Sequence, residues 1–360
     1  MPKALRIALA ALLTVLCASC MKWDYLTDED FDSSPAGLFV VNEGNFQFGN
    51  ATLSYYDPAT DRVENEVFAR ANGFKLGDVA QSMTMYGGRG WVVVNNSNVI
   101  FAIDPATFRE VGRITGLASP RYIHFVSPRK AYVTQLYDNR IVIVDPQTYT
   151  ITGYITVPEM EPGDGSTEMI VERGRYLYVN CFSYWDRVLR IDMETDQVVD
   201  RLVVGVQPKS MVADCFGRLW VLTNGGYPGN PFGYEAPRLV CIDTDSFTIE
   251  RTLYMQLGQN AADLTVNTAG DRLYWVADGV YTMSVSDTEL PAEPLIPAYD
   301  TYYNALTVSP FNDDIYLADA ADYQQYGLVY RYNRHGELLA TIQVGVIPGA
   351  FCWNTSDTEP

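Results

Sequence analysis

The sequence predicts an all-β protein, a seven-bladed β-propeller with four antiparallel strands in each blade. The main observation is a repeat of an apolar strand, a tight turn, an aromatic-rich strand, a third strand and a fourth, found seven times between residue 37 and the C-terminus. A period of roughly 40–50 residues with four strands per unit is typical of propellers. In successive copies the third strand ends at Asp57, Asp104, Asp145, Asp192, Asp243, Ser284 and Asn333.

Two further observations support this fold class. There is no amphipathic helical repeat of the kind that a βαβ fold requires. A stack of β-sandwiches is the rival architecture, but the period is constant and no linkers separate the copies. In the second copy the expected strands are 81–86, 91–95, 99–103 and 109–114, with the first turn at 87–90. Asp-Pro at the end of the third strand suits a β-turn, because Pro sets φ and the Asp carboxylate bonds to the turn backbone.

The two ends of the chain are expected to meet in one blade. Residues 37–43 already read as a second strand, so the first copy lacks an inner strand. Residues 347–353 form a lone strand after the seventh copy, and Pro348 matches Pro120 and Pro208 at the start of inner strands. The C-terminal strand therefore completes blade one and closes the ring, which leaves no open sheet edge.

The N-terminus reads as a targeting segment. Lys3 and Arg6 precede an apolar stretch, residues 7–16, which has the length of a signal-peptide core and is too short to span a bilayer. Small residues then precede Cys20 as in a lipobox, which makes Cys20 the lipidation site; a plain secretory signal is the alternative. The expected organisation is a signal peptide (1–19), an acidic tether (20–36), the propeller (37–354) and a tail (355–360). The acidic run resembles an export signal of lipoproteins that face the cell exterior from the outer membrane, or else is a plain solvated tether.

Composition excludes several function classes. With 44 acidic and 25 basic residues the formal charge is −19, so nucleic acid and anionic lipid headgroups are poor partners. Removal of residues 1–19 deletes Lys3 and Arg6 and takes the charge to −21. Only two His are present, which excludes a His-rich metal site; His124 is expected in the core and His335 in a turn on the far face. No nucleophile, phosphate-loop or zinc-protease motif is found, so the chain is not expected to be an enzyme.

Candidate binding residues gather in the loops between the second and third strands of the blades. These loops vary in length and carry aromatic and amide side chains, which give large contact area at low entropic cost. For each ring the alternative is simple packing of a loop onto the scaffold. The loop candidates are Phe46, Gln47, Phe48, Asn50, Tyr137, Asn139, Tyr184, Trp185, Tyr227, Tyr234 and Tyr323.

The starts of the inner strands are expected to line the mouth of the central channel. These residues carry charges of both signs, so a neutral, amide-rich ligand suits them best. The alternative is that Glu168 and Asp263 act as general acid or base. Calcium held by loop oxygens stays open, and no metal ligand is assigned. Repeated aromatics of the second strands, and the four remaining cysteines 181, 215, 241 and 352, are read as core, with a disulfide possible. The channel candidates are Arg121, Tyr122, Glu168, Lys209 and Tyr303.

Residues 38–45 (LFVVNEGN) and 51–57 (ATLSYYD) resemble the opening of Bacteroidetes surface lipoproteins of the YncE-like, DUF5074-type propeller group. The resemblance extends over the whole mature chain. It implies a surface lipoprotein that captures a nutrient, cobalamin or another corrinoid, as ligand rather than cofactor, and passes it to a TonB-dependent outer-membrane transporter. The alternatives are a glycan-binding propeller, a propeller lyase or hydrolase, and a structural partner of an outer-membrane complex.

Overall fold

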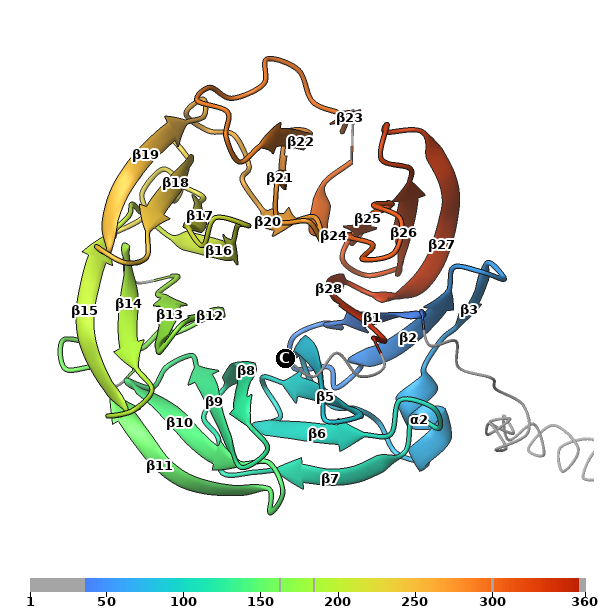
Figure 1. The fold of residues 1–360 in the computed structure, drawn as a ribbon. Helices are drawn as coiled ribbons and strands as arrows, with labels where there is room; N and C mark the ends of the chain where they lie inside the picture. The colour runs from blue at the N-terminus through green and yellow to red at the C-terminus, as the bar shows by residue number, and fades with distance from the viewer. Residues whose placement is uncertain (1–35, 162, 184, 299–300, 356–360) are drawn as a thin grey trace, which may run out of the picture.

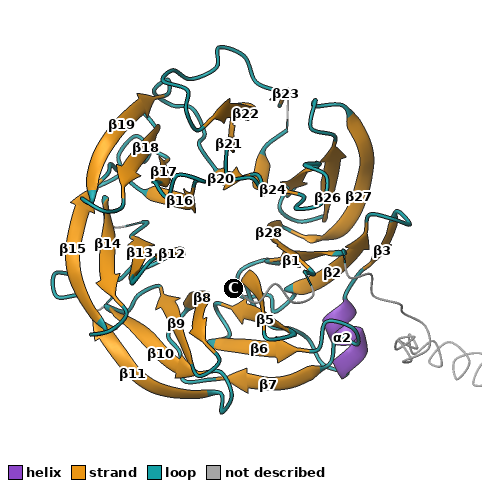
Figure 2. Ribbon diagram, in the orientation of Figure 1, coloured by secondary structure: helices purple, strands orange, loops and turns teal. Residues whose placement is uncertain are grey.

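The computed structural model describes residues 36–161, 163–183, 185–298 and 301–355. Over these ranges the strands form seven four-stranded sheets arranged as a ring around a central channel (Figure 1). Strands and loops make up nearly all of the ring, with one short helix on its outside (Figure 2). The predicted fold class, a seven-bladed β-propeller, is confirmed.

Each blade is an antiparallel sheet whose four strands follow one another from the channel outward. Blade 1 holds β28 (Pro348–Trp353), β1 (Leu38–Asn42), β2 (Thr52–Asp57) and β3 (Arg62–Glu64). Blade 2 holds β4 (Ala80–Tyr86), β5 (Arg89–Val94), β6 (Val99–Ile103) and β7 (Glu110–Ile114). Blade 3 holds β8 (Pro120–Ser127), β9 (Lys130–Gln135), β10 (Arg140–Asp145) and β11 (Thr150–Thr156). Blade 4 holds β12 (Ile170–Arg173), β13 (Tyr176–Asn180), β14 (Arg187–Asp192) and β15 (Gln197–Val203).

The remaining three blades repeat the order. Blade 5 holds β16 (Pro208–Ala213), β17 (Leu219–Thr223), β18 (Arg238–Asp243) and β19 (Thr248–Tyr254). Blade 6 holds β20 (Asp263–Val266), β21 (Arg272–Ala277), β22 (Gly279–Ser284) and β23 (Ile296–Pro297). Blade 7 holds β24 (Tyr303–Val308), β25 (Ile315–Asp319), β26 (Tyr326–Tyr332) and β27 (Leu338–Val346).

Ring closure occurs as the sequence predicts. The C-terminal strand β28 lies beside β1 as the innermost strand of blade 1, red beside blue in Figure 1. The two strands pair antiparallel, with Leu38 opposite Trp353 and Val40 opposite Phe351. The two termini of the ring are thus joined by main-chain hydrogen bonds, and blade 1 contains both.

The hydrophobic core lies between the blades. Each pair of neighbouring blades shares one cluster of buried apolar side chains, because the inner three strands are covered on both faces. Outer strands such as β15 alternate between exposed and half-buried residues, as expected for a strand with one wet face. The second-strand aromatics belong to these clusters, as predicted: Tyr132, Trp220, Tyr274 and Tyr316 are at most 3 % exposed.

The turns between the third and fourth strands are built by the repeated Asp. The Asp104 carboxylate accepts hydrogen bonds from the backbone N–H groups of Ala106 and Thr107, both at 2.9 Å. The Asp243 carboxylate accepts from the Ser246 backbone at 2.6 Å, and this bond lowers the pKa of Asp243. A single carboxylate satisfies backbone donors that the turn would leave unpaired, which explains its recurrence.

Three local features differ from expectation. The connection from blade 1 to blade 2 contains a helix, α2 (Val67–Asn72), whose Val67 and Phe68 pack into the cluster between these blades. His124 is not a core residue: its ring pairs with Glu172 at 2.8 Å, and its side chain is 27 % exposed. Cys215 is exposed, whereas the other three described cysteines are buried; all four are free thiols. No helix in the described part of the chain is long and apolar enough to cross a membrane.

Candidate functional site: the loop face and the channel beneath it

The inner strands turn polar side chains into the channel by means of β-bulges at their first residues. In β4 the pairing with β5 skips Gln81, and in β16 the pairing with β17 skips Lys209. In β8, Arg121 and Tyr122 share one place opposite β9, and Asn304 is skipped in β24. A bulge adds a residue to one strand and re-aims its side chain. The same device thus recurs at the same end of several blades and gives the channel mouth its polar lining.

Beneath this mouth is a cavity of about 530 Å³ to which all seven blades contribute. Phe182 and Glu43, which follow the second strands of blades 4 and 1, also line it, so the cavity reaches the face that carries the variable loops. Its polar lining comprises Glu43, Gln81, Ser82, Arg121, Tyr122, Glu168, Lys209, Ser210, Asp263 and Asn304.

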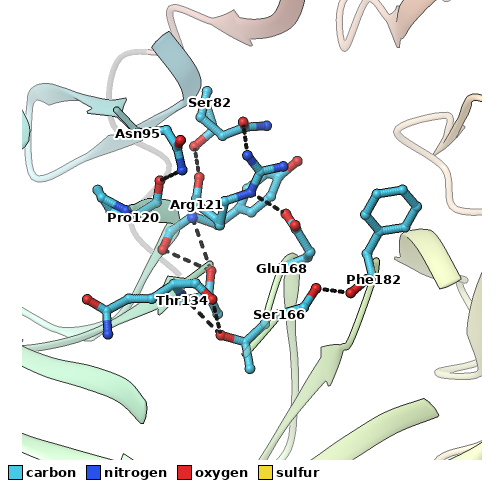
Figure 3. A network of polar contacts seen from close by, with 12 residues as sticks. Ser82, Asn95, Pro120, Arg121, Thr134, Ser166, Glu168 and Phe182 are labelled. Atoms are coloured by element: carbon cyan, nitrogen blue, oxygen red, sulfur yellow. Dashed lines mark hydrogen bonds and ion pairs between the residues drawn. The ribbon is translucent and has the colours of Figure 1, made fainter. Parts of the chain in front are cut away.

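An ion pair between blades 3 and 4 dominates one wall of the cavity. Arg121 Nε donates to Glu168 Oε2 at 2.8 Å, and a second guanidinium nitrogen donates to the Gln81 side chain (Figure 3). Burial lowers the pKa of Arg121, but the charge of Glu168 and the hydrogen bond to it raise the pKa more. Glu168 is 4 % exposed, and its other oxygen, Oε1, has no hydrogen-bond partner among the described residues.

Asp263 on the opposite side is a structural clamp. Its Oδ1 accepts hydrogen bonds from Ser210 Oγ at 3.0 Å and from its neighbour's backbone, and its Oδ2 accepts from the Leu306 backbone at 2.9 Å. The carboxylate thereby joins blades 5, 6 and 7. Burial raises the pKa of Asp263 despite these donors. Because both oxygens are occupied, Asp263 is poorly placed to act as a general base, the alternative role considered from the sequence.

Glu43 is a channel residue that the sequence analysis did not include among the ligand candidates. Burial raises its pKa, while the charges of Arg121 and Lys209 act in the opposite direction. Gly349 makes room for it, because a Cβ at that position would lie 2.2 Å from Glu43 Oε1. Lys209 holds its ammonium 5.9 Å from the Phe182 ring centroid and makes no ion pair or hydrogen bond within the described ranges.

Six of the predicted aromatic side chains form what we call the aromatic rim, on the loop face. They come from the loops that follow the second strands of blades 1, 3, 5 and 7, and they are between 41 and 75 % exposed. Loop 43–50 is fixed from both sides: Asn45 Nδ2 donates to the Tyr323 carbonyl at 2.5 Å, and the Gln47 backbone N–H donates to Asp78. The aromatic rim consists of Phe46, Phe48, Tyr137, Tyr227, Tyr234 and Tyr323.

Backbone conformation at the aromatic rim is unusual. Gln47, Tyr137 and Tyr323 have φ values of 70°, 64° and 63°, in the left-handed region that bulky residues rarely adopt. The same conformation occurs at Phe108, Tyr149 and Phe247 in the turns of the opposite face, so it reflects tight connections on both faces and does not by itself mark a binding site.

The other predicted residues have different positions. Asn50 holds its own loop in shape, because its Oδ1 accepts a hydrogen bond from the Asn45 backbone N–H at 2.8 Å. Asn139 ties its loop to the connection after β11, because its Nδ2 donates to the Met160 carbonyl at 3.0 Å. Trp185 is half-buried and packs on the core between blades 3 and 4. Tyr303 does not face the channel: it is 6 % exposed and belongs to the core between blades 6 and 7. Tyr184 lies outside the described residues, as do Cys20, the signal peptide and most of the tether.

The described residues contain no group of three or more His, Cys, Asp or Glu side chains arranged to hold a metal ion. Two of the channel carboxylates are already engaged: Glu168 is paired with Arg121, and Asp263 is saturated by N–H and O–H donors.

A family model described as "Domain of unknown function (DUF5074)" matches residues 36–348. The chain belongs to the DUF5074 family. No curated protein sequence is significantly similar to this chain. Solved structures similar to this DUF5074 propeller include a quinonprotein alcohol dehydrogenase-like protein from Bacteroides thetaiotaomicron, with a TM-score of 0.67 and 15 % identity over 89 % of this chain and 78 % of that one.

Two further similar structures carry lactonase names. The periplasmic gluconolactonase of Pseudomonas aeruginosa matches with a TM-score of 0.63 and 13 % identity. A putative 6-phosphogluconolactonase from Bacteroides uniformis matches with a TM-score of 0.62 and 15 % identity. Each match covers 88 % of this chain and 99 % of the other. At such identities the similarity establishes the propeller fold alone.

Proposed function

We propose that this DUF5074 propeller is a lipid-anchored surface protein that captures cobalamin or another corrinoid on its aromatic rim and passes it to a TonB-dependent outer-membrane transporter. One observation carries the proposal: exposed aromatic rings from four blades lie in the loops of one face, the face whose loop residues Glu43 and Phe182 also line the polar channel. Exposed apolar groups concentrated in this way usually mark a binding surface. The opening motif, which resembles that of BtuG-like cobalamin-binding propellers, supports the same ligand class.

The chemistry of a corrinoid suits this arrangement. A corrin ring has broad apolar faces and an edge of amide side chains, so it needs both flat aromatic contacts and hydrogen-bonding groups. Tyr137, Tyr227 and Tyr234 offer both in one side chain, because each retains a hydroxyl at the tip of an apolar ring.

Anchoring is proposed from the sequence. Lipidation at Cys20 attaches the chain to the outer membrane, and the acidic segment behind it keeps the propeller away from the lipid surface through its own charge. Substitution Cys20→Ala is expected to release the protein from the membrane fraction, as measured by fractionation and immunoblotting. Retention of the variant in the membrane would contradict lipid anchoring without affecting the ligand proposal.

A catalytic role is less well supported than binding. Asp263 is saturated by donors, so it does not match a general base aimed at a substrate, and a catalytic role would rest alone on the one oxygen of Glu168 that is unpaired among the described residues. A glycan is the competing ligand, because sugar rings also stack on Tyr and Trp.

Calorimetric titration with cyanocobalamin tests the proposal. Micromolar or tighter binding is expected for the native protein, and the double variant Tyr227→Ala/Tyr234→Ala is expected to weaken it by about tenfold or more, as for aromatic contacts at the centre of an interface. The matched control is Phe216→Ala, which removes an equally exposed ring from the opposite face and should leave affinity unchanged. Absence of both heat and a thermal shift would exclude a corrinoid, and binding in a glycan panel would then favour the competing ligand.

A further inference from the structure

The channel beneath the aromatic rim contains a set of polar groups that stacking on the rim does not use. We propose that this channel is a separate binding site for a small neutral polyhydroxylated molecule of monosaccharide size. The site is built from the unpaired groups of Glu168 and Lys209, together with Glu43 and Asn304, in the cavity of about 530 Å³. It does not depend on the corrinoid proposal, because its residues lie in the channel wall and not on the rim.

In the described part of the chain, one buried unsatisfied oxygen and one half-buried, unpaired cation indicate that the channel receives a ligand. Glu168 is 4 % exposed, yet its Oε1 has no hydrogen-bond partner among the described residues. Buried polar atoms in folded proteins nearly always have a partner, and an exception calls for an explanation. The Lys209 ammonium on the neighbouring blade lies 5.9 Å from the Phe182 ring centroid and has no ion pair or hydrogen bond among the described residues, so its donors are also available. One group needs a donor and the other an acceptor.

Charge balance favours a neutral ligand. The wall contains the carboxyls of Glu43, Glu168 and Asp263 against the cations Arg121 and Lys209. Arg121 is paired with Glu168, and Asp263 accepts from three donors, so neither Arg121 nor Asp263 needs a charged ligand as a partner. A free anion would approach Glu43 and Glu168, and a free cation would approach Arg121 and Lys209. Each would meet a like charge at short range in a site of reduced dielectric.

Hydroxyl groups match the remaining demands. A hydroxyl donates one hydrogen bond and accepts two, so neighbouring hydroxyls can donate to Glu168 and accept from Lys209 at the same time. Asn304 uses its Nδ2 on the Pro348 carbonyl, at 3.3 Å, which leaves its side-chain oxygen for another donor. Phe182, Met83 and Phe351 supply apolar surface for the C–H faces of a sugar ring. The volume of about 530 Å³ also falls in the usual range of small-molecule sites.

Entry is expected from the loop face. Phe182 belongs to the loop that follows β13 and Glu43 to the loop that follows β1, so the cavity is bounded at that end by segments of the variable loops. A small ligand would therefore pass the aromatic rim before it reaches Lys209 and Glu168.

The experiment is a calorimetric and saturation-transfer NMR titration with D-glucose, D-galactose and myo-inositol. D-gluconate and D-glucosamine serve as an anionic and a cationic comparator of similar size. At least one neutral polyol is expected to bind in the millimolar range or tighter, and both charged comparators about tenfold or more weaker. Lys209→Met, which keeps the apolar stem and removes the donor, should weaken polyol binding by at least about tenfold.

Controls separate this site from the rim. Tyr227→Ala/Tyr234→Ala should leave polyol binding unchanged, and melting curves will show whether Lys209→Met and a second channel variant, Glu168→Gln, remain folded. The inference is overturned if no neutral polyol binds at tens of millimolar, or if binding survives Lys209→Met but is lost in the rim variant. A parallel cyanocobalamin titration of the same preparation tests the proposed function, so either proposal can fail while the other stands.

Discussion

The two faces of this ring are made by the same seven blades, yet they differ in chemistry. The face with the short turns repeats one design, an Asp carboxylate that accepts from the turn backbone, and its connections expose two large hydrophobic side chains, Phe216 and Phe311, among the described residues. The loop face carries connections of varied length, the aromatic rim, and a channel mouth lined by bulged residues. Repetition on one face maintains the fold, which frees the other to vary with the ligand.

Carboxyl groups show the same contrast. In the turns, Asp192 and Asp243 are hydrogen-bonded by Arg175 and by Ser246 respectively, and these bonds lower their pKa values. In the channel, burial raises the pKa values of Glu43 and Asp263. Hydrogen bonds at the turns favour the charged form of these carboxyl groups, whereas burial in the channel disfavours the charged form of Glu43 and Asp263.

Ring closure has the largest expected effect, because blade 1 supports both faces. Deletion of residues 346–360 removes β28, exposes the edge of β1 and uncovers the channel wall at Gly349. We expect the cooperative thermal transition to disappear. The measurement is the near-ultraviolet circular dichroism signal followed on heating, which should show no sigmoidal transition in the truncated protein. Addition of a synthetic peptide of residues 346–360 should partly restore it. A truncated protein with an unchanged melting curve would show that β28 is dispensable.

Removal of the Asp263 carboxylate, the structural clamp of the channel, has the second largest expected effect. Asp263→Ala removes the acceptor shared by blades 5, 6 and 7, and should lower the free energy of unfolding by about 2–3 kcal/mol, the usual range for hydrogen bonds to a charged group. Asp243→Ala removes a carboxylate from an exposed turn and should have a clearly smaller effect. Urea unfolding of both variants provides the comparison. If the turn variant were the less stable one, the clamp interpretation would be wrong.

The sequence predicted the turn face better than the loop face, and the reason is the range of the interactions. An Asp at the end of a strand bonds to a backbone only two or three residues away, so its role can be inferred from its own neighbours. Bulges depend on the pairing of two strands, and a shift of one residue moves a side chain to the other side. Asn304 was correctly expected at the channel mouth, whereas its neighbour Tyr303, also expected there, points into the core on the other side of the strand.

Glu43 shows most clearly where prediction from local sequence patterns fails. Its place in the channel depends on Gly349, from the opposite end of the chain, and no pattern near residue 43 indicates that contact. The exposure of six loop aromatics followed from their position outside the repeat, whereas Trp185, in a loop of the same kind, packs on the core between blades 3 and 4.

Acidity should act in opposite directions on the turn carboxylates Asp192 and Asp243 and on the channel carboxyl Glu43. A lowered folded-state pKa, as at Asp192 and Asp243, gives stability that is present above the unfolded value of about 4 and is lost as pH falls through the folded value. A raised folded-state pKa, as at Glu43, gives stability that is present at pH values below the unfolded-state pKa and is lost as pH rises through the folded-state pKa.

The measurement is the urea midpoint as a function of pH in two variants. Asp192→Asn/Asp243→Asn should flatten the loss of stability below pH of about 4. Glu43→Gln should instead raise stability near neutral pH relative to the native protein and leave acid unfolding almost unchanged. Identical pH profiles for the two variants would contradict the proposed electrostatic difference between the turn carboxylates and Glu43.

The smallest expected effect is at Gly349, and it tests the channel without damaging the ring. In Gly349→Ala the new Cβ would lie 2.2 Å from Glu43 Oε1 and 2.8 Å from its Cδ and Cγ, so the whole Glu43 side chain is displaced, at a stability cost of about 1 kcal/mol, the lower end of the usual cost of overpacking. Gly153→Ala in the outer strand β11 is the matched control, because its Cβ meets only ordinary contacts with Ile143, at 3.5 Å. Polyol affinity should fall a few-fold in the first variant and stay constant in the second. Because Gly349 acts through Glu43, adding Glu43→Ala to Gly349→Ala should restore stability, whereas simple additivity of the two substitutions would show that the contact between them carries no energy.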